Sequence, residues 1–541
     1  MRVSLLQRGL RHVSPRACAA IVAAALAAGV GPAAAAEEPK HGGTLAYGIE
    51  SKIPWYDPHV VFGGSNKRVV LQIFEGLVNR DRTQEGVIPP LTAELAESWD
   101  VSEDGKTYTF HLREGVKFHD GTDFNADAVV FNMRRVIDPD FEFYQKNGAA
   151  LANGPYRFVK EVRAVDANTV EFELSQPWIH FLDQLTTTLP QGLPLIMSPA
   201  AVEKWGNEDV NLHPVGTGPF KLEKYDPGVQ TVLARNEDYW DDPLPYLDRI
   251  VFFVVPEASS RLTALEAGEV DMITAIPPDS VDSLRDQGFE ISMADAMNIV
   301  WFLSINQNEP HMKDVRVRQA VNYAIDRNGI ATELLRDTAM PISKMVPATS
   351  PLFDTETQAY PHDPEKAKQL LAEAGYPDGI EITGQFPTGG SYMIAPIAMA
   401  EWIQRDLAAV GINMKIQSFD WVTYLGHWVE GLKEDVAVNN MAWGTDYSEF
   451  WAVDVMSSDG FGNTGKINDP TLDSLFGEYQ VAVSQDAAIE VAHKIFDRVS
   501  DNAYFLPVVS DRAPIAHHSK IKGVKAVPDW LQVIKVYWID E

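Results

Sequence analysis

The sequence predicts a mixed α/β protein, and three kinds of pattern carry that prediction. Two stretches, "AESWDVSEDGKTYTFHL" and "VKEVRAVDANTVEFELS", have the pattern of strand, turn and strand. Two others, which begin at Asp314 and Asp363, have the pattern of capped amphipathic helices. Apolar runs such as "RIVFFVV" and "NMKIQSF" alternate with helical segments and are typical of strands. This alternation favours the mixed class.

The first element along the chain is a candidate secretory signal peptide. An apolar run from about residue 17 to 30 follows four arginines, Arg2, Arg8, Arg11 and Arg16. The run is shorter than the roughly 20 residues that cross a bilayer. Small residues precede Glu37, so we expect 1–36 to be removed after export. Because Cys18 lies at the start of the apolar run and not just after it, we expect no lipoprotein anchor.

The composition narrows the classes of partner. Cys18 is the only cysteine, so a chain that begins at Glu37 has neither a disulfide nor a thiolate metal site. The net charge of −31 argues against nucleic acid and anionic membranes as partners, since both need a basic face. With 541 residues and 45% hydrophobic residues, the chain has material for about three domain-sized units.

Two hairpins are expected in the first half. Asp104-Gly105 lies between two alternating runs, which is a strong turn signal. The segment 166–168 lies between two further alternating runs. Between these hairpins, Asp127, Val130 and Met133 begin a helical period.

The second half is expected to be richer in helices. Asp363 is a candidate N-cap, Pro364 lies in the first turn, and Gly375 is a stop signal. The apolar positions between them fall on one face: Ala367, Leu370, Leu371 and Ala374. The stretch from Asp314 repeats this logic, with Val317, Ala320, Val321, Ala324 and Ile325 on one side.

A search for catalytic and metal-binding motifs finds none. The sequence has no G-x-S-x-G elbow and no H-E-x-x-H motif, and no two histidines have the helical spacing of four. The "DGKT" stretch lacks the first glycine of a phosphate loop, because Asp100 occupies that position. We therefore predict no catalytic residue, no cofactor and no metal site, and we expect that the protein is not an enzyme.

One stretch, "WGTDYSEFW", places two acids, Asp446 and Glu449, among four aromatic side chains. Such a carboxylate suits a glycosidase, a pocket that binds an amine, and an ordinary domain core. A glycosidase needs two acids that the fold brings together, and the local spacing of this pair does not favour that role. Most of the tryptophans in this half are expected to pack in the core: Trp301, Trp402, Trp421, Trp428, Trp443 and Trp451.

Several collinear motifs resemble one family, the extracytoplasmic solute-binding proteins of ABC importers, family 5, which includes dipeptide- and oligopeptide-binding proteins. The motifs are "GGTLAYGIE", "YDPH", "IFEGLVNRD", "LAESWDVSEDGKTYTFHLREGVKFHDG", "GTGPFKLEKYDPG", "LARNEDYWD", "RLTALEAGEVDMI", "DVRVRQAVNYAIDR", "DPEKAKQLLAEAGYPDG" and "GINMKIQSFDW". The resemblance covers essentially the whole chain after residue 36. It specifies the scaffold better than the ligand.

The resemblance implies an α/β, two-lobed periplasmic-binding-protein fold of the cluster C type, with a hinge and an extra inserted domain in the first lobe. The lobes of such proteins close over the ligand. The segments expected in the first lobe are 37–85, 205–294 and 508–541. The insert is expected at 86–204 and the second lobe at 295–507.

The resemblance also implies a ligand site. Peptide-binding members have an aspartate three residues after a tryptophan, and this aspartate pairs with the peptide's amino terminus. Trp443 and Asp446 match in identity and spacing, with Tyr447 beside them. A carboxylate in a closed cleft needs a partner, and an ammonium group supplies a charge-assisted bond. Further candidates for ligand contact are Phe62, Gly64, Trp301 and Trp421.

Two features depart from the pattern of the oligopeptide-binding members. Those members carry basic residues shortly before the tryptophan, which meet the peptide's carboxylate. Here the stretch reads "DVAVNNMAWG", with Asn439 and Asn440 in that region. The family's frequent proline after the aspartate is also missing. No anchor for a ligand carboxylate can therefore be assigned from the sequence.

The expected function is capture of a peptide or peptide-like amine outside the cytoplasm, in the periplasm, and its delivery to the membrane subunits of an ABC permease. We expect a monomer that binds a small molecule or a short peptide and no nucleic acid. Alternatives on the same scaffold are an oligosaccharide, an opine-like conjugate or a chelated metal as the ligand. Alternatives of other classes are an extracytoplasmic glycoside hydrolase that uses Asp446 and Glu449, and a chaperone that holds unfolded chains.

Overall fold

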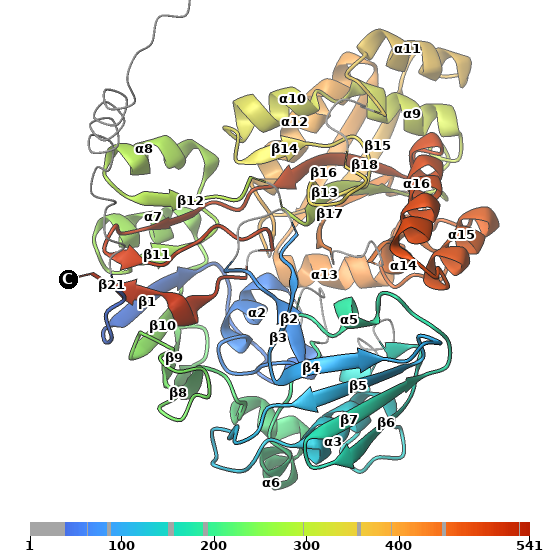
Figure 1. Ribbon diagram of the computed structural model, residues 1–541. Helices are drawn as coiled ribbons and strands as arrows, with labels where there is room; N and C mark the ends of the chain where they lie inside the picture. The colour runs from blue at the N-terminus through green and yellow to red at the C-terminus, as the bar shows by residue number, and fades with distance from the viewer. Residues whose placement is uncertain are drawn as a thin grey trace, which may run out of the picture. The chain divides into compact units, whose positions relative to one another are not determined.

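The computed structural model describes most of the chain. The described residues are 38–61, 63–83, 88–149, 156–187, 193–295, 297–353, 359–390, 392–445, 451–529 and 531–540. From His41 onward the chain forms one compact unit. This unit contains one seven-stranded sheet, one six-stranded sheet, one four-stranded sheet and two short strand pairs (Figure 1).

The seven-stranded sheet, here called the first sheet, collects strands from distant parts of the chain. Its order is β12-β19-β11-β1-β10-β9-β8, and β1 runs parallel to both β10 and β11. The bounds are β1 (Thr44–Ile49), β8 (Phe220–Asp226), β9 (Gln230–Arg235), β10 (Arg249–Val254), β11 (Met272–Ile273), β12 (Glu290–Ser292) and β19 (Ile515–His517). Its helices are α2 (Gly64–Val70), α7 (Ala258–Glu266) and α8 (Val281–Asp286).

The first sheet is held together by apolar side chains that alternate along its strands. Leu45 and Tyr47 of β1 and Ile250 and Phe252 of β10 are fully buried in one core. Burial of each such side chain contributes about 1.5–3 kcal/mol. The strand expected from "RIVFFVV" is confirmed as β10.

The four-stranded sheet is built from the two expected hairpins, and it has the order β4-β5-β7-β6. Its bounds are β4 (Ala96–Val101), β5 (Thr107–Leu112), β6 (Val159–Asp166) and β7 (Thr169–Leu174). The rings of Phe110 and Phe172, on neighbouring strands, meet edge to face at 5.5 Å. The helices of this part are α3 (Ala126–Ile137), α5 (Phe181–Gln184) and α6 (Pro199–Asp209). Both hairpins and the helix expected around residue 130 are confirmed.

The six-stranded sheet, here called the second sheet, has the order β14-β18-β13-β17-β15-β16. Its bounds are β13 (Ile299–Ile305), β14 (Ala339–Pro341), β15 (Ile380–Pro387), β16 (Ile412–Phe419), β17 (Val438–Gly444) and β18 (Phe505–Asp511). Every residue of β13 and β18 is buried. Such near-continuous burial is typical of strands that are covered on both faces.

Helices surround the second sheet. They are α9 (Val315–Ala324), α10 (Arg327–Gly329), α11 (Pro364–Glu373), α12 (Pro396–Ala409), α13 (Trp421–Glu430), α14 (Trp451–Met456), α15 (Pro470–Gln480) and α16 (Gln485–Asp501). The two caps expected from the sequence are confirmed. The carboxylate of Asp363 accepts a hydrogen bond from the backbone N–H of Lys366. That of Asp314 accepts one from the backbone N–H of Arg316.

Two segments carry the chain between the first and the second sheet. One is 293–298, between β12 and β13, and the other is 512–514, between β18 and β19. Figure 1 shows the second segment in red, running from β18 toward the first sheet. Arg512 joins the two, because its Nε donates to the carbonyl oxygen of Ala294 at 2.9 Å. Its Nη1 also donates to the carbonyl oxygen of Asp337, before β14, at 3.1 Å.

Two short pairs complete the strands. These are β2 (Val78–Arg80) with β3 (Leu91–Ala93), and β20 (Ile521–Lys522) with β21 (Trp538–Ile539). The sequence expects a change of lobe at residue 508, whereas β18 keeps its pairing in the second sheet through Asp511. The lobe limits expected from the sequence stay predictions.

Candidate functional site

A cavity of about 580 Å³ lies between the two large sheets, and we call it the central cavity. Side chains beside the first sheet form one wall, which includes Glu50, Arg68 and Arg261. The segments that follow α10 and β15 form the opposite wall, and residues 511 and 513–515, in and beside the second connecting segment, close the side. A cavity with contributions from both sheets is the usual place for a small ligand in a two-lobed protein.

Glu50, directly after β1, is held by its neighbours. Its carboxylate accepts hydrogen bonds from the hydroxyls of Ser65 and Thr274. It also pairs with Arg68 of α2, with 3.3 Å between Nη1 and Oε2. Burial on its own would raise the pKa of Glu50, but the charge of Arg68 and the bond from Ser65 outweigh it and lower the pKa to about 2. The Glu50 carboxylate is therefore occupied by partners within the cavity wall.

Among the described residues, Arg261 of α7 is bound to the protein backbone and not to a carboxylate. Its guanidinium donates to four backbone carbonyl oxygens, over distances of 2.7–3.2 Å. The acceptors lie in two loops, at residues 255–256 and 274–275. Because all of these bonds lie within the protein, Arg261 joins two loops of the wall and has no need of a ligand anion.

Gly64 is explained by a close approach between two elements. A Cβ at residue 64 would lie 2.7 Å from ring atoms of Tyr392, which follows β15. A Cβ at Gly444, at the end of β17, would lie 3.6 Å from the same ring. Tyr392 thus lies between the start of α2 and the end of β17. Only glycine leaves room for this contact at residue 64.

Trp421 opens α13 and packs under the glycine loop after β15. Its ring stacks on that of Tyr424 at 6.1 Å. Gly390, which lines the central cavity, has a φ of +147°, and a Cβ there would lie 2.4 Å from Trp421. The indole therefore supports the cavity wall from behind.

Trp443, near the end of β17, is 4% exposed and packs against Trp428, with 5.8 Å between their ring centroids. It is opposite Val300 of β13, whereas Trp301 is opposite Ala442. Because side chains alternate along a strand, Trp301 and Trp443 lie on opposite faces of the second sheet. The structure does not bring these two candidates together.

Three of the candidates lie outside the described residues: Phe62, Asp446 and Tyr447, and the same holds for Glu449. The residue before Asp446 is firmly anchored. The backbone N–H of Thr445 donates to the carbonyl oxygen of Asn298 at 2.7 Å, and its hydroxyl donates to the same oxygen at 2.8 Å. The chain thus leaves β17 beside the first connecting segment. A ligand role for any of the candidates stays a prediction.

Sequence reasoning missed several residues around the central cavity, among them Glu50, Arg68, Tyr392 and Asp511. The cavity forms only when elements more than 400 residues apart come together, so local patterns carry little signal for it. For Asp511 the sequence offers a weak sign, an acid that ends the apolar run "FLPVVS".

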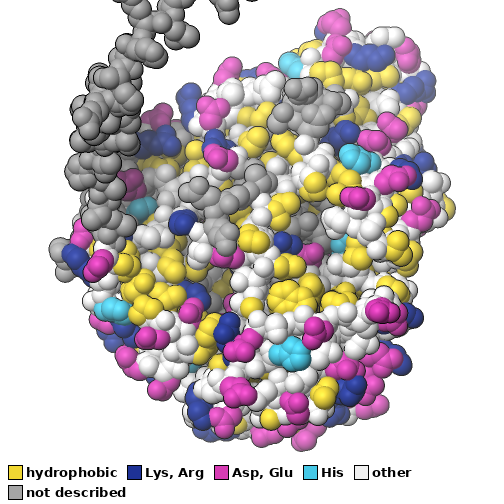
Figure 2. Space-filling model, viewed as in Figure 1, with side chains coloured by type: hydrophobic (Ala, Val, Ile, Leu, Met, Phe, Trp, Pro, Cys, Tyr) yellow, Lys and Arg dark blue, Asp and Glu magenta, His cyan; other side chains and the backbone are white. Residues whose placement is uncertain are grey.

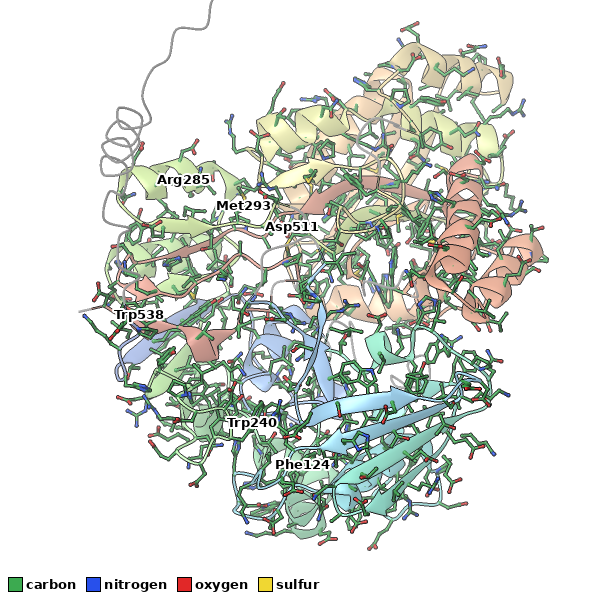
Figure 3. All side chains as sticks on the ribbon, viewed as in Figure 1. Phe124, Trp240, Arg285, Met293, Asp511 and Trp538 are labelled. Atoms are coloured by element: carbon green, nitrogen blue, oxygen red, sulfur yellow. The ribbon has the colours of Figure 1, made fainter. Side chains whose placement is uncertain are left out.

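A second cavity of about 450 Å³ lies beside β2 and β3. Glu75 and Glu94 both line it. The carboxylate of Glu75 accepts bonds from the hydroxyl of Tyr239 at 2.6 Å, the indole N–H of Trp240 at 2.9 Å and the hydroxyl of Thr217 at 2.8 Å. Figure 3 labels Trp240 in this region.

Glu94 is satisfied in the same way, by the backbone N–H of Gly76 at 2.7 Å and the side-chain amide of Asn79 at 3.0 Å. Burial, together with the charge of Glu75, raises the pKa of Glu94 to about 7. Every carboxylate oxygen of this pair has a protein partner. The second cavity is therefore a weaker candidate for ligand binding than the central cavity.

The described residues hold no group of three or more His, Cys, Asp or Glu side chains that could bind a metal ion. Within the same residues, no helix combines the length and the apolar character that a membrane span requires. Figure 2 shows acidic and basic side chains interspersed over the visible face of the molecule.

Comparison with known proteins identifies a family and relatives that this chain resembles. The family "Bacterial extracellular solute-binding proteins, family 5 Middle" matches residues 91–462. The "Dipeptide-binding protein" of Escherichia coli K12 is 31% identical over 459 residues, which are 82% of each chain.

Two solved structures match almost throughout. The periplasmic binding protein DppA of Helicobacter pylori, in complex with the peptide STSA, has a TM-score of 0.80 at 25% identity and covers 93% of this chain and 99% of its own. The binding protein AgaA of A. tumefaciens R10, in complex with agropinic acid, has a TM-score of 0.77 at 25% identity, with coverage of 92% and 99%. The mixed α/β, two-lobed fold expected from the sequence is confirmed. The chain belongs to family 5 of the bacterial extracellular solute-binding proteins.

Proposed function

We propose that this protein captures a peptide or a peptide-like amine and delivers it to the membrane subunits of an ABC importer. The observation that carries the proposal is the central cavity of about 580 Å³, whose walls come from both large sheets. A solute that fills it would contact both lobes at once. Ligand contacts made only in the closed form are what drive hinge closure.

The amine part of the proposal rests on Asp446, three residues after Trp443. Thr445, the last described residue before Asp446, donates its hydroxyl to the carbonyl oxygen of Asn298 in the first connecting segment. A carboxylate that is enclosed with a ligand ammonium group forms a charge-assisted bond worth about 1.5–3 kcal/mol. The similarity to a dipeptide-binding protein supports a ligand of this class.

Native mass spectrometry of the purified protein tests the ligand class directly. A binding protein that keeps its ligand during purification should show an added mass that fits a peptide or another amine. Melting curves with a peptide, amine and sugar panel extend the test. A ligand that binds only the folded state, at 100 times its Kd, adds about 2.7 kcal/mol of stability. A response to neutral sugars alone would contradict the proposal.

The substitution Asp446→Asn tests the assigned anchor. Asparagine keeps the size of the side chain but removes its charge, so a bound ammonium group would lose its partner. We expect a loss of about 2–5 kcal/mol in binding, which is roughly 30-fold to several-thousand-fold in Kd. Calorimetric titration of wild type and variant measures it, and binding within about threefold of wild type would remove Asp446 from the site.

A second candidate is an opine-like conjugate on the same scaffold. The similarity to a structure in complex with agropinic acid favours it over the remaining alternatives. The mass of the bound molecule decides between the two. The hydrolase alternative would be supported if the wild type released hydrolysis products from a bound compound and the Asp446→Asn variant did not.

We also propose export to the periplasm with removal of 1–36, a monomeric state, and no lipid anchor. The arginine-led apolar run and the small residues before Glu37 support the cleavage. The intact mass of the protein from its native host checks the cleavage and the lipid anchor, and light scattering checks the monomer.

A further inference from the structure

Asp511 holds a special position beside the central cavity. It is the last residue of β18, at the point where the chain leaves the second sheet (Figure 3). The side chain is 1% exposed, and the residue lines the cavity. Its Oδ1 accepts a bond from the backbone N–H of Ala513 at 2.7 Å. Within the described part of the chain, its Oδ2 has no hydrogen-bond partner.

An unpaired carboxylate oxygen in such a place is unusual. Burying a polar atom without a partner costs free energy, and nearly all buried polar groups are therefore paired. Burial raises the pKa of Asp511 to about 7, while the backbone N–H groups of Ala513 and Arg512 oppose the rise. Near neutral pH the side chain can therefore gain its missing partner and its charge in one step, when a cation enters the cavity.

The other charged groups of the inner wall, which are not exposed, do not compete for that cation. Glu50 is paired with Arg68, and Arg261 is bound to backbone carbonyl oxygens. Among the described residues, Asp511 is thus the acid of the inner wall with a buried and unpaired carboxylate oxygen. Unlike the acids of the second cavity, it has not been satisfied by the protein.

The exposed charges around the central cavity have the same sign. Three exposed acids line it, Glu257, Asp279 and Glu333, against one exposed base, Arg336. These side chains add a net negative potential at the mouth, which favours entry of a cation over an anion.

The sheet also relates Asp511 to the proposed amine anchor. β17 and β18 flank β13 and both run antiparallel to it, so they end at the same edge of the second sheet. Trp443 and Ser510 are both opposite Val300. Two strand spacings separate them, which is about 10 Å. The ends of β17 and β18 can therefore serve two groups of one ligand.

We propose that Asp511 is a second ligand anchor, which binds an ammonium or guanidinium group of the ligand at the end of β18. The proposal rests on the proposed function, because it assigns a second cationic group to the same amine-containing solute. It predicts a preference for peptides or conjugates with a basic side chain.

Calorimetry with two matched dipeptides tests the preference. Ala-Arg and Ala-citrulline have nearly the same shape, but only the first carries a guanidinium charge. We expect wild type to bind Ala-Arg about 10- to 100-fold more tightly, in line with a charged partner for a buried acid. Asp511→Asn should abolish that preference and leave the Kd for Ala-citrulline within about threefold.

The pH profile separates a ligand contact from a structural role. Because the cation needs the ionised acid, the affinity of wild type for Ala-Arg should increase between pH 6 and pH 8. The Asn variant should show no such increase. A wild-type affinity that falls over this range would mean that a protonated Asp511 donates to the ligand, and would overturn the proposal.

A control and a second probe keep the outcomes distinct. Asp486→Asn removes the same charge at an exposed site on α16, and it should leave the preference for Ala-Arg unchanged. Equal Kd values for both dipeptides in wild type would overturn the role of Asp511 and leave the proposed function standing.

If neither dipeptide binds, agmatine and spermidine are tested by melting shift. A shift that Asp511→Asn abolishes would support the cation anchor and leave only the peptide part of the proposed function wrong. The absence of any shift in wild type would overturn both proposals.

Discussion

Both cavities are lined by carboxylates that are removed from solvent, but the two cavities differ in how far hydrogen bonds from the protein satisfy these carboxylates. In the second cavity, Glu75 and Glu94 are surrounded by hydroxyl, indole and amide donors that fill their oxygens. In the central cavity, Asp511 is more deeply buried than Glu94, yet one of its oxygens is open. Burial and a raised pKa are common to both places. The unfilled acceptor is what separates a candidate binding site from an internal support.

This comparison is most strongly tested at Glu75. Glu75→Ala would leave the hydroxyls of Tyr239 and Thr217 and the indole of Trp240 without their acceptor. With about 1–3 kcal/mol for each of the three unpaired donors, we expect the free energy of unfolding to fall by about 3–9 kcal/mol. Ligand affinity should stay within about threefold. Chemical denaturation and calorimetry measure the two quantities, and a large loss of affinity with little loss of stability would reverse the assignment.

The next effect is the pH dependence of stability that comes from Asp511. Its pKa is raised in the folded protein to about 7, so the folded state holds the proton more tightly than the unfolded chain does. The resulting stabilisation is complete below the unfolded pKa and is lost as the pH rises toward about 7. At 1.36 kcal/mol per pKa unit, the loss is at most about 4 kcal/mol.

Denaturation of wild type and Asp511→Asn between pH 4 and pH 8 isolates this contribution. The difference between the two proteins should shift in favour of the variant as the pH rises. A saturating cationic ligand should flatten the dependence, because it stabilises the ionised acid. The same experiment on Glu94→Gln should show no such response to ligand.

A smaller effect is expected at Gly64. Gly64→Ala places a methyl group 2.7 Å from the ring of Tyr392, so the loop after β15 must move. Overpacking of this kind costs about 1–3 kcal/mol. Because the contact joins the two walls of the cavity, the cost should appear as weaker ligand binding, by about tenfold. If Tyr392→Ala in the same chain restores the affinity, the contact itself is responsible; if it does not, another cause must be sought.

The smallest effect is expected from Glu94→Gln. Glutamine keeps one of the two bonds, to Gly76 or Asn79, and removes the repulsion from Glu75. These terms oppose each other, so we expect a change in the free energy of unfolding within about 1 kcal/mol. A clear change in ligand affinity would place the second cavity among the functional sites.

The sequence predicts the local elements of this fold well, because their causes are local. Asp363 and Asp314 cap their helices as expected, and Asp104-Gly105 joins a hairpin. The motifs of the family predict the two-lobed arrangement through resemblance. The faces of the second sheet are different, since they depend on the pairing register. That Trp301 and Trp443 point to opposite faces follows only once both strands are aligned.

The site was less predictable for the same reason. The loop after β15 meets α2 through Tyr392 and Gly64, which are far apart in the sequence. Asp511 is a candidate because the groups that surround it in the fold leave its Oδ2 without a hydrogen-bond partner among the described residues. No sequence motif predicts such an unpaired oxygen. Aspartate at the end of a strand is otherwise an ordinary residue.

The bonds of Arg512 constrain how the two lobes can move. Two chain segments lie side by side between the sheets, and the guanidinium of Arg512 in one donates to the carbonyl oxygen of Ala294 and to the carboxylate of Asp295 in the other. A pair of linked connections behaves like a strip: it bends easily across its width, but twisting it would stretch these bonds. We therefore expect the lobes to open and close along one angular coordinate, with Asp511 one residue from the axis. An anchor so near the axis moves little during closure, and it can hold one end of a solute while the distant walls swing over the other.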